Sequence, residues 1–193
     1  MTDEELLTDA SRGDEAAFRE LYERHRDVVF RFAYRMLGTK ELAEDVAHDC
    51  FVSLIERPLG FDPKRANLRT YLFAAVRNLA MKHFRRTRRD EDIDALDNEP
   101  IKLGTDQPLS KLLDREVCMI VKQAVAQLPE LQREALVLFE YEDCSLAEIS
   151  RIVSADVGTV KARLYRARQA LKRSLAGYFA DEPETMTLEE VCK

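Results

Sequence analysis

Apolar residues recur at intervals of three and four along most of the chain, a spacing that places them on one face of a helix. The first such segment extends from Ala17 to Leu37 and is followed by Gly38, a residue suited to ending a helix. The second follows Thr39, a potential N-cap, and ends before Pro58, which cannot continue a helix. The pattern therefore predicts two long amphipathic helices in this part of the chain.

A third helix is predicted after an aperiodic loop, Leu59–Ala66. Asn67 is placed to cap this helix, and the inward stripe of the helix includes His83, which we interpret as a core residue. Cations gather in its last two turns: Lys82, Arg85, Arg86, Arg88 and Arg89.

A second run of helices begins near Ser110, and Pro129 suits the first position of the next helix in it. Ser145 and Glu148 then have the spacing of a capping box, which opens a short helix. After a turn, Asp156 can cap a final long helix that extends to about Leu175.

Composition supports an all-α fold, because the 193 residues include only six Gly and six Pro. We predict two small helical domains, a three-helix domain over residues 1–89 and a four-helix domain over residues 110–177. Residues 90–109 are acidic and contain Pro and Gly, so they are expected to be a linker, and residues 178–193 form an acidic tail.

The net charge of −6 conceals an uneven distribution. The acidic linker and tail together carry more negative charge than the net charge of the whole chain. The remainder of the chain is therefore net positive. Basic residues are concentrated at Lys82–Arg89 and Lys161–Arg173. Such local clusters of basic residues, more than the net charge, determine where the phosphates of a nucleic acid are attracted to the protein. They therefore indicate a nucleic-acid partner.

The first ten residues are acidic and lack the basic, apolar character of a secretory signal, and no apolar run is long enough to span a bilayer. We therefore expect a cytoplasmic protein. Its four cysteines are widely spaced without a CxxC pair, so reduced thiols are expected and no metal site is predicted.

The segment Ser145–Arg173 has the pattern of a helix-turn-helix, whose second helix enters the major groove of DNA. On that helix Val160, Leu164, Ala167 and Leu171 form an inner face. The opposite face supplies the predicted base contacts Ala162, Tyr165 and Arg166, and the predicted backbone contacts are Thr159, Lys161 and Arg163. The alternative interpretation is a solvated basic helix that covers a core.

Three motifs in this region resemble region 4 of extracytoplasmic-function sigma factors: Leu128-Pro-Glu-Leu-Gln-Arg-Glu134, Ser145-Leu-Ala-Glu-Ile149 and Val157-Gly-Thr-Val-Lys-Ala-Arg-Leu-Tyr-Arg-Ala-Arg168. The N-terminal half is similar to region 2 of the same family in Phe18-x-x-Leu-Tyr22, Ala43-Glu-Asp-Val-Ala-His-Asp-Cys-Phe51, Leu68-Arg-Thr-Tyr-Leu72 and Arg77-Asn-Leu-Ala80. The resemblance covers roughly residues 14–89 and 110–175.

The resemblance implies a protein without catalysis of its own that directs RNA polymerase to promoter DNA. It implies that the second helix binds a coiled coil of the polymerase β′ subunit through Glu44, Asp45, His48 and Asp49, although His48 stands where glutamine is usual. It further implies duplex recognition of the −35 element by the helix-turn-helix. A possible anti-sigma factor is a further implied partner.

For the third helix and the loop before it, the resemblance implies capture of the melted −10 element as a single strand. That task requires cations and an aromatic or amide surface for unstacked bases. The residues of these types are Phe61, Lys64, Arg65, Asn67, Arg69, Tyr71, Arg77, Asn78, Arg85 and Arg86. Tyr71 stands where many relatives have tryptophan, and core packing is an equally good interpretation of it.

Two other classes of function remain open. A stand-alone helix-turn-helix regulator would use residues 14–89 as a sensor domain. An enzyme would need a nucleophile–base pair or a carboxylate constellation, and we find neither among the three histidines and scattered cysteines. No phosphate-binding GxxxxGK[ST] loop occurs, and no cofactor is predicted.

Overall fold

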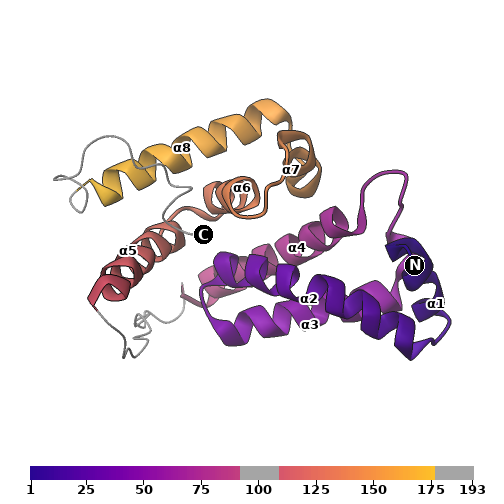
Figure 1. Ribbon diagram of the computed structural model, residues 1–193. Coiled ribbons are helices and arrows are strands. Elements are labelled where there is room, and N and C mark those ends of the chain that lie inside the picture. The colour runs from indigo at the N-terminus through magenta and orange to yellow at the C-terminus, as the bar shows by residue number, and fades with distance from the viewer. Residues whose placement is uncertain (92–108, 177–193) are drawn as a thin grey trace.

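The computed structural model describes residues 1–91 and 109–176, and over these residues every regular element is helical (Figure 1). The helices are α1 (Asp3–Ser11), α2 (Glu15–Leu37), α3 (Lys40–Glu56), the 3₁₀ turn η1 (Pro58–Gly60), α4 (Leu68–Glu91), α5 (Leu109–Ala126), α6 (Glu130–Glu140), α7 (Leu146–Val153) and α8 (Val157–Leu175). The expected all-α fold with two helical units is confirmed. The predicted acidic linker and tail lie almost entirely outside the described residues.

The N-terminal unit is built from α1–α4, in which α2 packs against α3 and α4. Phe32 of α2 and Phe73 of α4 are fully buried, with ring centroids 5.0 Å apart. Asn67 caps α4 as predicted, because its side-chain oxygen accepts the backbone N–H of Thr70 at 2.8 Å. Thr39 precedes α3 as predicted, but its hydroxyl makes no capping hydrogen bond.

Helix α1 is an addition to the predicted elements. Thr2 and Glu5 form a capping box at its start, and Leu6 and Leu7 are buried against the rest of the unit. The helix is only nine residues long, so its apolar positions are too few to establish a period from the sequence.

The C-terminal unit contains α5–α8. Helix α5 begins one residue before the predicted start near Ser110, and α8 ends at Leu175 as predicted. Ser145 and Glu148 form the predicted capping box, and Asp156 caps α8 by accepting the backbone N–H of Thr159. Ser154, in the turn between α7 and α8, adopts the left-handed conformation with φ 52°. Pro129 is extended and lies just before α6, one residue earlier than predicted.

The two units contact each other through α4 and α7 and through α2 with α5 and α6. In Figure 1, α6 and α7 lie between α8 and the N-terminal unit. Helix α8 therefore has one side against its own unit and another side facing away from the molecule. This arrangement decides which of the predicted site residues are accessible.

Candidate nucleic-acid interface

The recognition helix α8 separates apolar and polar residues as the sequence predicted. Val160, Leu164, Ala167 and Leu171 are all buried. On the opposite side Tyr165 is 66% exposed and Arg166 is exposed, while Ala162 is half-buried. These three predicted base-contacting residues are thus on one accessible face, together with a shallow groove lined by Gln132, Tyr165, Arg166, Gln169 and Arg173.

The three residues predicted to contact the DNA backbone are placed differently from one another. Lys161 is exposed on α8. Thr159 is held at the helix start, where its hydroxyl donates to the Asp156 carboxylate at 2.6 Å. Arg163 points toward α6, where its guanidinium donates to the Glu134 carboxylate at 2.8 Å.

Glu134 is the centre of an ion-pair cluster between the two units. Its side chain is completely buried, and it binds Arg163 from α8 and Arg77 from α4, each at 2.8 Å. Burial raises the pKa of the Glu134 carboxyl, and the two guanidinium groups oppose that shift. A buried carboxylate without these partners would be strongly disfavoured.

Glu142 forms a second cluster, in the turn between α6 and α7. It is 2% exposed, and its carboxylate lies 2.9 Å from Arg35 of α2 and 3.5 Å from Arg69 of α4. Arg69 also donates to the backbone carbonyl of Glu142 at 2.5 Å. Burial raises the pKa of Glu142, and neighbouring arginines lower it.

Most of the other residues predicted to bind the −10 strand are exposed. Those in the loop before α4 and along α4 itself are Lys64, Arg65, Asn67, Asn78, Arg85 and Arg86. Phe61 and Tyr71 are half-buried and form an edge-on pair with centroids 5.6 Å apart. A Cβ atom at Gly60 would meet the Tyr71 hydroxyl at 3.0 Å, so the absence of a side chain there lets the loop approach Tyr71.

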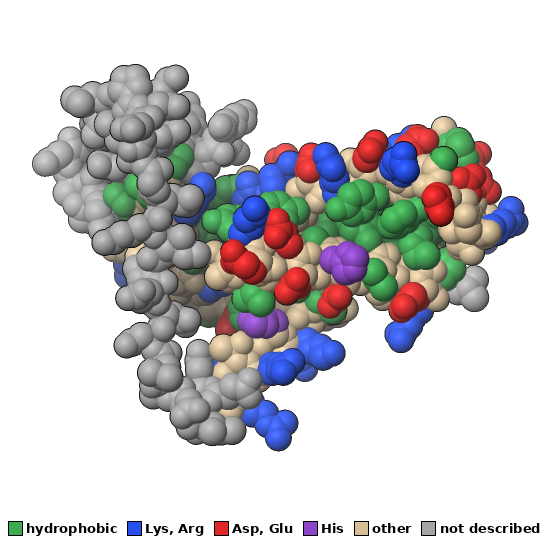
Figure 2. Space-filling model, turned by 90° about the horizontal axis from the view of Figure 1, so that it is seen from below, with side chains coloured by type: hydrophobic (Ala, Val, Ile, Leu, Met, Phe, Trp, Pro, Cys, Tyr) green, Lys and Arg blue, Asp and Glu red, His purple; other side chains and the backbone are tan. Residues whose placement is uncertain are grey.

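The outer face of α3 presents the four residues predicted to bind polymerase: Glu44, Asp45, His48 and Asp49 are all exposed. Val52 on α3 and Tyr22 on α2 are each 39% exposed. Figure 2 views the molecule from the side on which α3 lies in Figure 1, and acidic side chains surround an apolar strip there. This face combines apolar area with negative charge.

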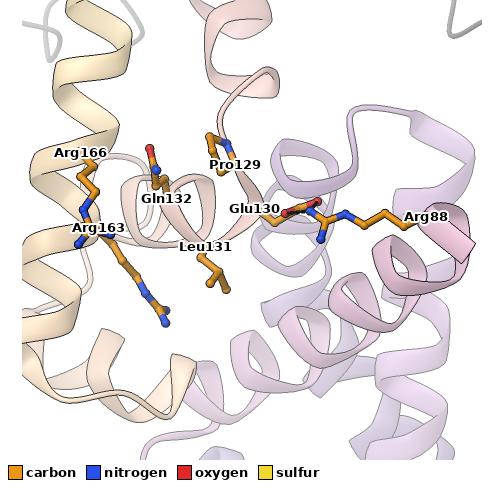
Figure 3. Close-up of a pocket in the computed structure, with 7 residues that line it drawn as sticks. All are labelled: Arg88, Pro129, Glu130, Leu131, Gln132, Arg163 and Arg166. Carbon is orange, nitrogen blue, oxygen red and sulfur yellow. Dashed lines mark hydrogen bonds and ion pairs between the residues drawn. The ribbon is translucent and has the colours of Figure 1, made fainter.

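A pocket of about 400 Å³ lies where the end of α4 approaches α6 and α8 (Figure 3). Arg163 and Arg166 line it from α8, and Arg88 lines it from α4 and forms an ion pair with Glu130 at 2.6 Å. The pocket is therefore rich in guanidinium groups contributed by both units.

Other kinds of site gain no support from the described residues. They contain no group of three His, Cys, Asp or Glu that could hold a metal ion. Burial raises the pKa of the Cys50 thiol to about 12, so this group is protonated at neutral pH. No helix in the described part of the chain is long and apolar enough to cross a membrane.

Sequence reasoning assigned no role to Glu134, Glu142 or Arg35. A usable signal existed for Glu134, because it is three and four residues before the buried Val137 and Leu138 and so belongs to the inward stripe of α6. An acid at such a position requires a cationic partner. Nothing in the sequence indicates that one partner, Arg77, comes from the other unit.

Two family models match the chain, sigma-70 region 2 over residues 21–90 and sigma-70 region 4 over residues 118–171. The chain is 32% identical to the RNA polymerase sigma-H factor of Pseudomonas aeruginosa, over 90% of this chain and 93% of that protein. It is 29% identical to the ECF RNA polymerase sigma factor SigW of Bacillus subtilis, over 88% and 94% of the two chains.

Solved structures show the same likeness. The sigma factor RpoE of Bartonella quintana, in complex with the anti-sigma factor NepR, has a TM-score of 0.67 and 26% identity, covering 82% of this chain and 96% of that one. CnrH in complex with the cytosolic domain of CnrY has a TM-score of 0.62 and 27% identity, covering 93% and 99%.

Proposed function

This chain belongs to the extracytoplasmic-function sigma factors of the sigma-70 family and acts as an RNA polymerase sigma factor, and we propose how its residues divide that work. The C-terminal unit recognises the −35 element as duplex, and the N-terminal unit holds both core polymerase and the melted −10 strand. The observation that carries this division is the exposed, basic outer face of α8, opposite a buried apolar face.

For the −35 element, Ala162, Tyr165 and Arg166 contact base edges in the major groove. Their common accessible face supports this assignment. Lys161 and Thr159 contact the DNA backbone beside these residues. Arg163 also contacts the backbone when its hydrogen bond to the Glu134 carboxylate is broken.

For the −10 strand, the exposed cations of the loop and α4 hold the backbone, and Tyr71 with Phe61 offers an aromatic surface to unstacked bases. Extruding a base from the duplex costs a few kcal/mol. Polymerase binding and strand capture supply that free energy, since the protein has no catalysis of its own in this proposal.

For core polymerase, α3 binds the β′ coiled coil. Glu44, Asp45, His48 and Asp49 provide the polar contacts, and the exposed Val52 adjoins His48 and Asp49 one turn along the same face. A partly apolar patch among acids suits a partner that offers both apolar and basic side chains.

An anti-sigma factor is a further partner in this proposal. The similar structures of RpoE and CnrH are complexes with NepR and with CnrY, and they support a comparable inhibitor for this chain. The protein is proposed to act in the cytoplasm, where core polymerase and promoters are found.

Run-off transcription tests the proposed function. Purified chain is added to core polymerase on a library of promoter fragments, and the transcribed fragments are sequenced. We expect a shared pair of elements that core polymerase alone does not select. The absence of any selection by the mixture would contradict a sigma role.

Gel shifts on a selected promoter separate this function from a stand-alone regulator. A sigma factor should shift free duplex weakly alone and strongly with core polymerase. Tight, site-specific binding by the chain alone, unaffected by polymerase, would instead favour the regulator.

A further inference from the structure

The cations of α8 fall into two sets, which differ in whether a carboxylate already binds them. Arg163 pairs with Glu134, and Arg168 pairs with Glu140. The other cations of this helix are exposed and form no ion pair with any residue that the structure describes: Lys161, Arg166, Lys172 and Arg173. At about 3.6 residues per turn these side chains lie within roughly 140° of one another around the helix axis, so they form one cationic face.

A shallow groove lies within this cationic face. It has a volume of about 380 Å³ and is lined by Gln132 of α6 and by Tyr165, Arg166, Gln169 and Arg173 of α8. Tyr165 is 66% exposed, and none of the residues that line the groove is acidic. Gln132 and Arg166 also line the neighbouring pocket in Figure 3. The groove thus offers guanidinium groups beside an uncovered aromatic ring, which suits a segment with both carboxylates and apolar side chains.

The acidic tail of this chain, residues 178–193, has such a composition. It lies outside the described residues, and its sequence places the acids in two groups: Asp181, Glu182 and Glu184, then Glu189 and Glu190. Met186 and Leu188 stand between the two groups, and Lys193 is the only cation of the tail. The tail is therefore opposite in charge to the cationic face of α8 and supplies apolar side chains as well.

The tail also begins close to the cationic face. The described chain ends at Ala176, directly after α8. Along the helix axis Arg166 is about 15 Å and Lys161 about 22 Å from Ala176, at about 1.5 Å per residue. An extended segment spans about 3.3 Å per residue, so Asp181 reaches up to about 16 Å from Ala176 and Glu189 up to about 43 Å. The two groups of acids are therefore tethered closely enough to reach the whole face.

We propose, on the basis of the proposed sigma function, that the acidic tail binds the cationic face of α8 and competes there with the −35 duplex. Carboxylates and phosphates accept hydrogen bonds from the same guanidinium groups, so the duplex has to displace the tail. Each exposed ion pair is weak, but attachment to the same chain gives the tail a high local concentration. The tail therefore lowers the affinity for duplex without abolishing it.

The first experiment tests tail binding in the absence of DNA. A tail-neutral variant keeps the full chain but replaces the acids of the tail by amides: Asp181→Asn, Glu182→Gln, Glu184→Gln, Glu189→Gln and Glu190→Gln. A fluorescent peptide with the wild-type sequence of residues 178–193 is titrated against this variant at low ionic strength, and anisotropy measures binding.

We expect saturable binding of the peptide to the tail-neutral variant. Adding Arg173→Glu should weaken it by about fivefold or more, because the substitution reverses a charge of the cationic face. Lys122→Glu is the matched control, since Lys122 is an exposed cation on α5, and it should change the affinity by less than about twofold. Circular dichroism checks that Arg173→Glu remains helical, and Lys172→Glu takes its place if it does not.

The second experiment measures competition with DNA. Duplex that carries the selected −35 element is titrated against the wild type, the tail-neutral variant and a linker-neutral variant. The linker-neutral variant is the matched control, because it removes the same number of acids from residues 92–108 by amide substitution of Asp92, Asp94, Asp97, Glu99 and Asp106. Each titration is repeated over a range of salt concentrations.

We expect the tail-neutral variant to bind the duplex about tenfold more tightly than the wild type, the combined effect of several surface ion pairs. Its affinity should also fall more steeply with salt, because displacement of an acidic tail no longer offsets the release of counterions from the duplex. The linker-neutral variant should stay within about twofold of the wild type.

Absence of peptide binding, or equal weakening by Arg173→Glu and Lys122→Glu, would overturn the tail as the occupant of this face. An equal gain in duplex affinity in both neutral variants would overturn it too, since net charge or the linker would then be responsible. Peptide binding without a gain in duplex affinity would reject the competition. Failure of the sigma function is a separate result, which shows as a wild-type chain that cannot direct core polymerase in run-off transcription.

Discussion

Arg166 is the residue whose role in promoter choice is easiest to isolate. It is exposed on the outer face of α8, and the pocket beside it leaves its guanidinium accessible (Figure 3). Arg166→Ala should weaken binding to the selected −35 element by about 1–3 kcal/mol and relax specificity at one position, if the contact is bidentate to guanine.

Selection of promoters from a randomised −35 library by variant holoenzyme measures this effect. Arg168→Ala is the matched control, because Arg168 on the same helix binds Glu140 and lies over the Phe139 ring. An Arg166→Ala holoenzyme that selects the wild-type sequence would show that Arg166 does not read a base.

Ser154 illustrates strain at a single residue. It adopts φ 52° and ψ 46°, a left-handed conformation that costs an L residue about 1–2 kcal/mol. Glycine adopts this conformation without that cost but loses more entropy on folding, so Ser154→Gly should increase the free energy of unfolding by up to about 1 kcal/mol. Ala155→Gly, at the neighbouring position without positive φ, should decrease it. Urea unfolding of the two variants provides the measurement, and equal shifts would contradict the strain.

At the scale of the element, the start of α7 depends on a carboxylate. Glu148 accepts from the Ser145 hydroxyl at 2.7 Å and from the Ser145 backbone N–H at 2.9 Å, and these bonds lower the pKa of Glu148 below its ordinary value of 4.5. A carboxyl whose pKa is lowered by folding stabilises the folded state above its ordinary pKa, and this contribution is lost as pH falls below that value.

We therefore expect the melting temperature of the wild type to fall more than that of Glu148→Gln between about pH 6 and about pH 3.5. Glutamine retains the geometry of a capping box but does not titrate. Thermal melts of both proteins across this range measure the difference. Parallel pH profiles would show that the Glu148 charge contributes nothing to the cap.

At the scale of the whole molecule, Glu134 connects α4, α6 and α8. Glu134→Ala leaves Arg77 and Arg163 without their carboxylate at positions that are 18% and 16% exposed. Breaking a buried ion pair from one side is strongly destabilising, so the free energy of unfolding should fall by about 3 kcal/mol. Glu140→Ala removes a pair with the half-exposed Arg168 and should cost about 0–1 kcal/mol.

Denaturant unfolding of the two variants compares these values directly. Adding the single variant Arg77→Ala and the double variant Glu134→Ala/Arg77→Ala completes a double-mutant cycle, which isolates the part of the effect that crosses between the units. A Glu134→Ala protein as stable as Glu140→Ala would mean that the cluster does not contribute to folding.

Local sequence determined most of the helices and the chemistry of the surfaces. The spacing of Val160, Leu164, Ala167 and Leu171 fixed which side of α8 is buried, and Ser145 and Asp156 fixed where α7 and α8 begin. These features depend on residues within one or two turns of each other, which is why the pattern alone was sufficient.

Only the tertiary structure decided which cations are free. Arg77, Arg163 and Arg166 carry the same charge in the sequence, but Glu134 engages the first two and leaves Arg166 exposed. Arg77 and Glu134 are 57 positions apart, and Arg35 and Glu142 are 107 apart, so no periodicity links them. A buried charge requires a partner in space, and the folded chain alone determines which residue that partner is.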